Sequence, residues 1–284
     1  LDGADPIQYA IRGACLPLND FDTFDEVVSR FTKAAMIPLS LYGKAYVRKK
    51  GILLHDPKAE EIWAAEGFPL KGKAKSKWLA YNMAIRARIY DDWVKEQLRQ
   101  YPDALVLHIG CGLDSRCERV QVPFTQWIDA DLPDVIAVRR RYFNETDTYR
   151  MMTLDASNPD EVQKLPDAER IVVVMEGLSM YLTNDALARF FTALQAKYKA
   201  VHVLLDIYTV FGAKASKYKN PINEVGVTQV YGIDDIHALV SDTGLRVVQE
   251  CNMIPSHLVN ELNGFDKVFF QRMFTGKTYQ KIYR

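Results

Sequence analysis

Short apolar segments alternate with helical patterns through the middle of the chain. The first, Ala104–Ile109, is apolar except for His108 and ends at Gly110. Four further segments are candidate strands: Phe124–Ala130, Tyr149–Leu154, Ile171–Met175 and Val201–Ile207. Apolar runs of this length, without polar alternation, are typical of strands buried on both faces of a parallel sheet.

Helical patterns separate several of these strands, at Pro133–Phe143, Pro159–Leu165 and Asn184–Lys199. The alternation predicts a doubly wound α/β sheet with right-handed crossovers. Another helix is expected near Asp234–Thr243, followed by two strand-like runs, Leu245–Met253 and Asp266–Phe274. Because no long helix separates these two runs, we expect them to form an antiparallel hairpin at one edge, which gives a seven-stranded, mostly parallel sheet.

The first hundred residues show helical patterns and no strand signals. Apolar spacing predicts a helix from Phe24 to Met36, ended by Pro38. A second helix should begin after Asp56-Pro57 and stop near Gly67, and a third should run from Ser76 to Gln100. We therefore expect residues 1–102 to form a helical cap on a core of residues 103–284, as one integrated unit.

Composition narrows the class of protein. The 284 residues carry 36 basic and 36 acidic side chains, so there is no basic excess of the kind that nucleic-acid binders show. No apolar run approaches the ~20 residues of a membrane span. The four cysteines, at positions 15, 111, 117 and 251, lack the regular spacing of a disulfide framework or zinc site. Since the first residues also lack a signal-peptide pattern, we expect a cytoplasmic protein with reduced thiols.

A Gly-x-Gly turn follows the first strand, at Gly110 and Gly112. Glycines there let the backbone approach a ligand without an intervening Cβ. A dinucleotide-binding turn has a third glycine three residues later, and this chain has Ser115 instead. The pattern therefore favours S-adenosylmethionine, which has no phosphate, over a nicotinamide or flavin cofactor. A turn without any ligand is the alternative.

Acidic residues follow several of the predicted strands. Asp131 lies 19 residues after Gly112, where a carboxylate can accept hydrogen bonds from both ribose hydroxyls; a helix cap before Leu132-Pro133 is the other interpretation. Asp155, Glu176 and Asp206 also end strands. Three such acids would suit a metal, but no histidine lies beside them and a cationic cofactor explains Asp155 and Glu176, so we expect no metal.

Three motifs resemble those of the leucine carboxyl methyltransferase family, which includes the tetracenomycin-type polyketide O-methyltransferases. Gly110–Arg116 (GCGLDSR) resembles the family's GAGLDTR, and Trp127–Ile136 (WIDADLPDVI) resembles its W-x-E-V-D-L-P-E-V-I segment. Glu176–Leu182 (EGLSMYL) resembles EGLLMYL. With the upstream Asp56-Pro57 and Arg86-x-Arg88, the likeness covers about residues 24 to 210. Cys111 in place of Ala and His108 in place of a small polar residue depart from the pattern.

The resemblance implies a Rossmann-like class I methyltransferase with a helical N-terminal cap and S-adenosylmethionine as cofactor. It places Arg88 on the methionine carboxylate of the cofactor, Asp131 on the ribose and Glu176 at the methionine end, with Asp155 beside the adenine. The full set of cofactor-binding residues that it implies is Arg88, Gly110, Cys111, Gly112, Asp114, Asp131, Leu132, Asp155, Ala156, Glu176 and Gly177.

The methyl acceptor is less clearly marked. Tyr181 and Tyr208 each follow a strand end and are candidate catalytic residues that orient a substrate, although packing explains Tyr181 equally well. Arg86 is the candidate for binding a substrate carboxylate, with a plain surface charge as the alternative. A lysine-bearing segment between Tyr208 and Tyr231 could recruit an acidic substrate or simply be solvated.

These observations predict an S-adenosylmethionine-dependent O-methyltransferase. Its expected partner is a small molecule, polyketide-like or another secondary metabolite, methylated on a carboxylate or hydroxyl. The alternatives are a protein C-terminal leucine carboxyl methyltransferase and a catalytically inactive S-adenosylmethionine-binding scaffold. A nicotinamide oxidoreductase is disfavoured by Ser115. The sequence indicates neither the acceptor nor an oligomeric state.

Overall fold

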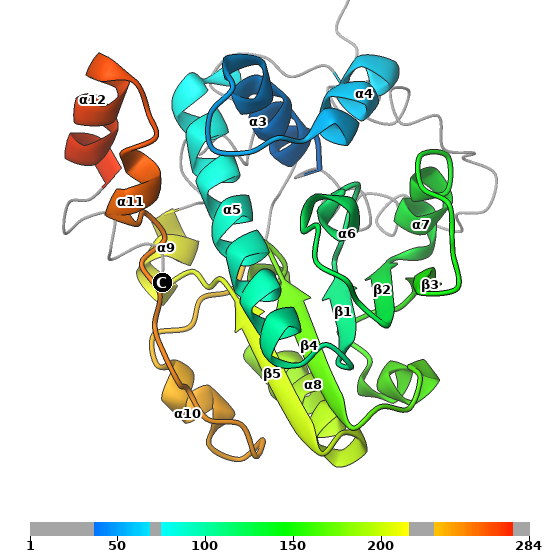
Figure 1. Cartoon of the computed structure of the whole chain (residues 1–284). Helices are drawn as coiled ribbons and strands as arrows, with labels where there is room; N and C mark the ends of the chain where they lie inside the picture. The colour runs from blue at the N-terminus through cyan, green and yellow to red at the C-terminus, as the bar shows by residue number, and fades with distance from the viewer. Residues whose placement is uncertain (1–36, 69–74, 216–229, 275–284) are drawn as a thin grey trace, which may run out of the picture.

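A parallel sheet forms the centre of the protein, and the computed structural model describes it within residues 37–68, 75–215 and 230–274 (Figure 1). Five strands are seen in the described residues: β1 (Leu105–Ile109), β2 (Gln126–Asp131), β3 (Tyr149–Thr153), β4 (Arg170–Met175) and β5 (Ala200–Leu205). Their order is β3-β2-β1-β4-β5. The chain thus builds outward from β1 to β3 and then resumes on the other side of β1, which places the topological switch point between β1 and β4.

Residues of the central strands alternate between two apolar clusters. Leu105, Leu107 and Ile109 of β1 lie in one cluster, whereas Val106 lies in the other. The strand β4 alternates in the same way. A strand whose successive side chains enter two cores has both faces buried, which is why these segments are apolar at nearly every position.

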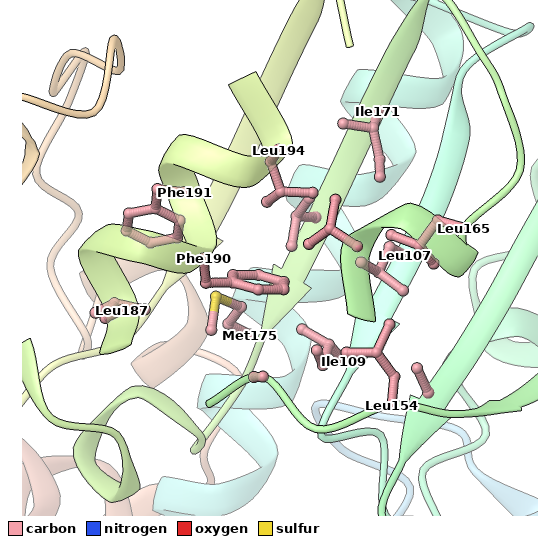
Figure 2. Close-up of a cluster of buried hydrophobic side chains, with 14 of the residues drawn as sticks. Leu107, Ile109, Leu154, Leu165, Ile171, Met175, Leu187, Phe190, Phe191 and Leu194 are labelled. Carbon is pink, nitrogen blue, oxygen red and sulfur yellow. The ribbon is translucent and has the colours of Figure 1, made fainter. Parts of the chain in front are cut away.

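Helices cover both faces of the sheet. The first cluster includes side chains of α8 (Asn184–Lys197) and the 3₁₀ helix η3 (Pro159–Lys164), packed against β1 and β4 (Figure 2). The second includes α5 (Lys77–Gln100) and reaches α7 (Pro133–Arg139). The short α6 (Arg116–Arg119) follows the turn after β1.

Two of the three expected N-terminal helices are confirmed. The helix α4 (Pro57–Glu66) is capped by Asp56, whose carboxylate accepts a hydrogen bond from the Ala59 N–H, and it ends at Gly67 with a φ of 61°. The helix α5 is capped by Ser76. The expected helix over residues 24–36 lies outside the described residues.

The helix that Pro38 was expected to end lies outside the described residues, and Pro38 itself is part of a helix. Pro38 is the second residue of α3 (Ile37–Lys50), and buried α3 side chains include Leu41 and Lys44.

The prediction of a C-terminal hairpin is wrong. No strand covers residues 245–253, and Asp266–Phe274 belongs to the helix α12 (Gly264–Phe274). The aromatic run that suggested a strand packs on a helix instead: Phe270 meets Tyr81 of α5 edge-on, with ring centroids 6.1 Å apart. The described sheet therefore has five strands, not seven.

Short elements complete the described chain: the 3₁₀ helix η4 (Ser179–Tyr181), α9 (Val210–Ala215), α10 (Ile236–Val240) and α11 (Ser256–Val259). Of the helices in the described ranges, none is long and apolar enough to span a membrane.

Candidate active site

A cavity lies at the carboxyl ends of the parallel strands, where open α/β sheets bind their ligands. Its lining comes from the segments that follow β1, β2, β3 and β4, together with side chains of α3 and α5. In Figure 1, α3 lies beyond the strand ends. With the single exception of Arg88, all the predicted cofactor-binding residues line this cavity: Gly110, Cys111, Gly112, Asp114, Asp131, Leu132, Asp155, Ala156, Glu176 and Gly177.

The turn after β1 is held open by two glycines in the left-handed region. Gly110 has a φ of 69°, and a Cβ at this position would come within 3.0 Å of the Leu178 side chain. Gly112 has a φ of 53°. Other residues adopt these angles only with strain, so the glycines are required both by the backbone and by the space around Gly110.

Asp131 ties this turn to the end of β2. Its carboxylate accepts a hydrogen bond from the Gly112 N–H at 2.7 Å and another from the Leu132 N–H at 2.8 Å. The sequence left open a capping role and a ligand role for Asp131. Asp131 therefore holds the turn through these two bonds and also lines the cavity.

Asp129, two residues earlier, has a structural role. It is fully buried, forms an ion pair with Arg139 and accepts a hydrogen bond from the Tyr149 hydroxyl at 2.8 Å. Arg139 also donates to the backbone oxygens of Gly112 (3.1 Å) and Asp114 (2.8 Å). The pair therefore supports the glycine turn from beneath.

Glu176 ends β4 between two arginines. It accepts a hydrogen bond from Arg86 Nε at 3.0 Å and forms an ion pair with Arg116, and its side chain is only 6% exposed. Burial opposes ionisation of Glu176, but the charges of Arg116 and Arg86 outweigh it and lower its pKa to about 2. Glu176 is therefore a carboxylate at neutral pH.

A second buried group of charges surrounds Asp114. Lys44 of α3 lies 2.9 Å from its carboxylate, and Arg119 donates to it at 2.8 Å. Arg119 also reaches Asp56 and Asp91. Burial alone would raise the pKa of Asp114, yet Arg119, Lys44 and Arg116 together lower it well below its usual range. These pairings attach α3, α4 and α5 to the turn after β1.

The structure places the two arginines of α5 in different surroundings. Arg86 lines the cavity and contacts both Glu176 and Asp206, the latter at 3.4 Å. Arg88 does not line it: its guanidinium donates to the Leu53 backbone oxygen at 2.7 Å and to Asp92. Residues two apart on a helix point in different directions, so only one arginine can face the cavity.

The remaining predicted residues also line the cavity. Tyr181 and Tyr208 are in its lining, together with Met180. Asp155 uses one oxygen to accept hydrogen bonds from the Ser157 N–H (2.9 Å) and hydroxyl (2.8 Å), which leaves its other oxygen for a further partner. Asp206 instead accepts from the Tyr90 hydroxyl at 2.8 Å and the Gly177 N–H at 2.6 Å, so it supports the turn after β4.

Lys44 and Arg116 are residues of the charged network that the sequence did not lead us to predict. No motif marks Lys44, which is 1% exposed and lies in a helix that the sequence did not predict. Arg116 did have a signal, because it closes the GCGLDSR motif. It is fully buried and pairs with Asp91, Asp114 and Glu176.

The charges of the lining suit a ligand that carries positive charge. Among the charged side chains that line the cavity, the carboxylates are Asp114, Asp131, Asp155 and Glu176, and the cations are Lys44 and Arg86. The surplus of carboxylates favours a net positive ligand. Within the described part of the chain, no three or more His, Cys, Asp or Glu side chains are grouped to hold a metal ion.

Comparison with known proteins agrees with this geometry. The family model for leucine carboxyl methyltransferase matches residues 25–195. The chain is 33% identical to the tetracenomycin polyketide synthesis O-methyltransferase TcmP of Streptomyces glaucescens over 187 residues, which is 65% of this chain and 69% of TcmP. It is also 33% identical to the S-adenosyl-L-methionine-dependent methyltransferase dpfgK of Gibberella zeae, over 40% of this chain and 41% of that protein.

Among solved structures, the magnesium protoporphyrin IX methyltransferase ChlM of Synechocystis PCC 6803, with bound SAH, superposes with a TM-score of 0.46 at 13% identity. The match covers 73% of this chain and 91% of ChlM. So weak a superposition adds nothing to the assignment made from sequence.

Proposed function

This chain belongs to the leucine carboxyl methyltransferase family, and from that premise we propose how its cavity works. The protein is an S-adenosylmethionine-dependent O-methyltransferase. The observation that carries the assignment of the site is that the three family motifs converge on one cavity at the carboxyl ends of β1, β2 and β4. The division into a helical cap (1–102) and a cofactor-binding core (103–284) is part of the proposal, as is a cytoplasmic location.

The cofactor site runs along the strand ends. Gly110 gives the cofactor close access to the backbone, Asp131 at the end of β2 accepts the ribose hydroxyls, and the second oxygen of Asp155 accepts the adenine amino group. Support comes from the φ of Gly110, from the place of Asp131 in the cavity lining beside the glycine turn, and from the Asp155 oxygen that the Ser157 bonds do not use.

At the methionine end, Arg86 takes the role first expected of Arg88. Its guanidinium binds the carboxylate of the cofactor, helped by Lys44, while Glu176 faces the ammonium group. The support is that Arg86 and Lys44 are the cationic side chains in the described cavity lining. His108 also lines the cavity, but its ring is neutral. A planar fork suits a carboxylate because it donates two parallel hydrogen bonds.

Bound there, S-adenosylmethionine supplies an activated methyl group on a sulfonium. The protein therefore contributes proximity, orientation and exclusion of water for an in-line displacement. Tyr181 and Tyr208 line the cavity and are the side chains that we assign to orienting the acceptor. A carboxylate acceptor is ionised at neutral pH and needs no general base, whereas a phenol benefits from one.

The acceptor is a small molecule. The name of TcmP, which refers to tetracenomycin polyketide synthesis, supports a polyketide-like or other secondary metabolite that is methylated on a carboxylate or hydroxyl. Esterification of a protein C-terminus is the alternative within the family, and it requires a docking surface for a protein partner.

The experiment is a calorimetric titration of the purified protein with S-adenosylmethionine, S-adenosylhomocysteine and NADH in parallel. We expect micromolar binding of both adenosyl compounds and none of NADH. If folded, ligand-free protein binds neither adenosyl compound, the proposed cofactor site is wrong.

A further inference from the structure

His108 is a buried histidine beside the cofactor site for which neither the sequence motifs nor the proposed mechanism provides a role. It lies on β1, is 1% exposed, and its Nε2 is 2.9 Å from Arg116 Nη1. A guanidinium only donates hydrogen bonds, so Nε2 must be the acceptor. The imidazole proton of the neutral ring therefore sits on Nδ1, an assignment that follows from the hydrogen-bond network.

The second ring nitrogen of His108, Nδ1, lies near Asp129. It is 3.3 Å from Asp129 Oδ1, but the approach is not aligned for a hydrogen bond, and Nδ1 has no other partner. The other charge near the ring is Asp114, whereas β4 presents the apolar Val174 opposite His108. Burial and then the charge of Arg116 lower the pKa of His108 below its usual 6.5, so the ring is neutral at physiological pH.

Each nitrogen of the Arg116 guanidinium has a partner. Nε donates to Asp91 at 2.9 Å, Nη1 to His108, and Nη2 reaches both Glu176 and Asp114, the latter at 3.2 Å. Because the fork is planar and rigid, the bond to His108 determines which corner of the guanidinium faces Glu176.

We propose that His108 is a positioning residue of the cofactor site, which through Arg116 holds the Glu176 carboxylate in the orientation that receives the cationic end of S-adenosylmethionine. The inference rests on the proposed function, because it assigns Glu176 to the methionine end of the cofactor. A histidine that only fills space in the core would need no acceptor at Nε2.

Two amide substitutions separate positioning from packing. In His108→Gln, the side-chain oxygen can occupy the place of Nε2 and accept from Arg116. In His108→Asn, the shorter side chain reaches only the place of Nδ1, so Arg116 loses its acceptor. Both variants are probed by calorimetric titration with S-adenosylhomocysteine, and the melting temperature of each is recorded.

We expect His108→Gln to bind S-adenosylhomocysteine within about threefold of the wild type, and His108→Asn to bind about tenfold or more weakly, since hydrogen bonds that involve a charged group are the stronger ones. Equal affinities in both variants, or equal losses that accompany equal falls in melting temperature, would overturn the inference. Failure of the wild type to bind would instead contradict the proposed function.

The tautomer provides an independent spectroscopic test. In ¹⁵N spectra of the wild type, the imidazole signals that disappear in His108→Gln should report a protonated Nδ1 and an unprotonated Nε2. The opposite tautomer would leave Arg116 facing a donor and would overturn the inference.

Discussion

The cavity has two linings of different chemistry. The charged lining consists of Lys44, Arg86, Asp114, Asp131, Asp155 and Glu176, and each of these side chains has an ionic or backbone partner. The aromatic lining consists of Met180, Tyr181, Leu182 and Tyr208. In the aromatic lining, the backbone oxygens of Met180 and Tyr208 accept hydrogen bonds from the Tyr231 and Ile233 N–H groups, each at 2.7 Å.

The difference indicates a division of labour. A network in which every charge has fixed partners recognises one ligand with defined charges, as the cofactor is. A lining of apolar and aromatic groups selects by shape and tolerates variation, as an acceptor pocket does. The predictions below test this contrast, in order of decreasing effect.

Removing a charge from the charged lining should have the largest effect. Glu176→Leu leaves Arg86 and Arg116 with an uncompensated buried charge, so we expect the free energy of unfolding to fall by about 3–5 kcal/mol. Urea denaturation followed by circular dichroism measures the change. A loss below 1 kcal/mol would show that the network does not depend on Glu176.

A methyl group on the glycine turn should have a smaller effect. Gly110→Ala combines a positive φ with a close approach to Leu178, so we expect about 1–3 kcal/mol lower stability and weaker S-adenosylhomocysteine binding. Gly51→Ala is the matched control, because Gly51 has a similar φ of 65° but open space around its Cβ position and does not line the cavity. Weakened binding in both variants would mean that backbone strain alone, not the site, is responsible.

Acid should weaken the charged lining in two stages. His108 has a lowered pKa when folded, so between its folded and unfolded values the unfolded chain binds the additional proton. Its contribution to stability is complete above pH 6.5 and is lost as the pH falls through the folded pKa. The contribution of Glu176 is complete above its unfolded pKa of 4.5 and is lost as the pH falls from there to its folded pKa of about 2. Subtracting the unfolding free energies of His108→Gln from those of the wild type, from pH 8 to 4, isolates the first stage; a constant difference would contradict it.

The smallest effect is expected in the aromatic lining. Tyr181→Phe keeps the ring and removes the hydroxyl, so S-adenosylhomocysteine affinity should stay within about twofold. Once an acceptor is known, methyl transfer should fall if the hydroxyl orients it. Unchanged turnover would leave Tyr181 as a packing residue.

The sequence predicted most of the sheet and the glycine turn because both depend on local signals. The strand β1 is apolar since both of its faces are buried, and Gly110 is fixed by its φ. The C-terminal hairpin failed because aromatic residues such as Phe269 and Phe270 also suit a helix packed on α5; Trp78 lies 4.4 Å from the Phe269 ring. Tertiary packing decided between the two structures.

The side-chain network could be predicted only in part. Asp131, Asp155 and Glu176 line one cavity, as the sequence led us to expect, because parallel strands bring their carboxyl ends to one edge. Choosing between Arg86 and Arg88 required knowing which face of α5 is buried, and the motif alone did not provide it. The neighbours four residues on distinguish them: Tyr90 is buried, whereas Asp92 is half-exposed and pairs with Arg88.

The most direct test of the central claim compares the same substitution at these two positions. Arg86→Lys and Arg88→Lys both keep the charge on α5 and remove the guanidinium fork. In calorimetric titrations with S-adenosylhomocysteine, we predict at least about tenfold weaker binding for Arg86→Lys and no change for Arg88→Lys. Weaker binding for Arg88→Lys with normal binding for Arg86→Lys would show that the cofactor does not occupy the cavity described above.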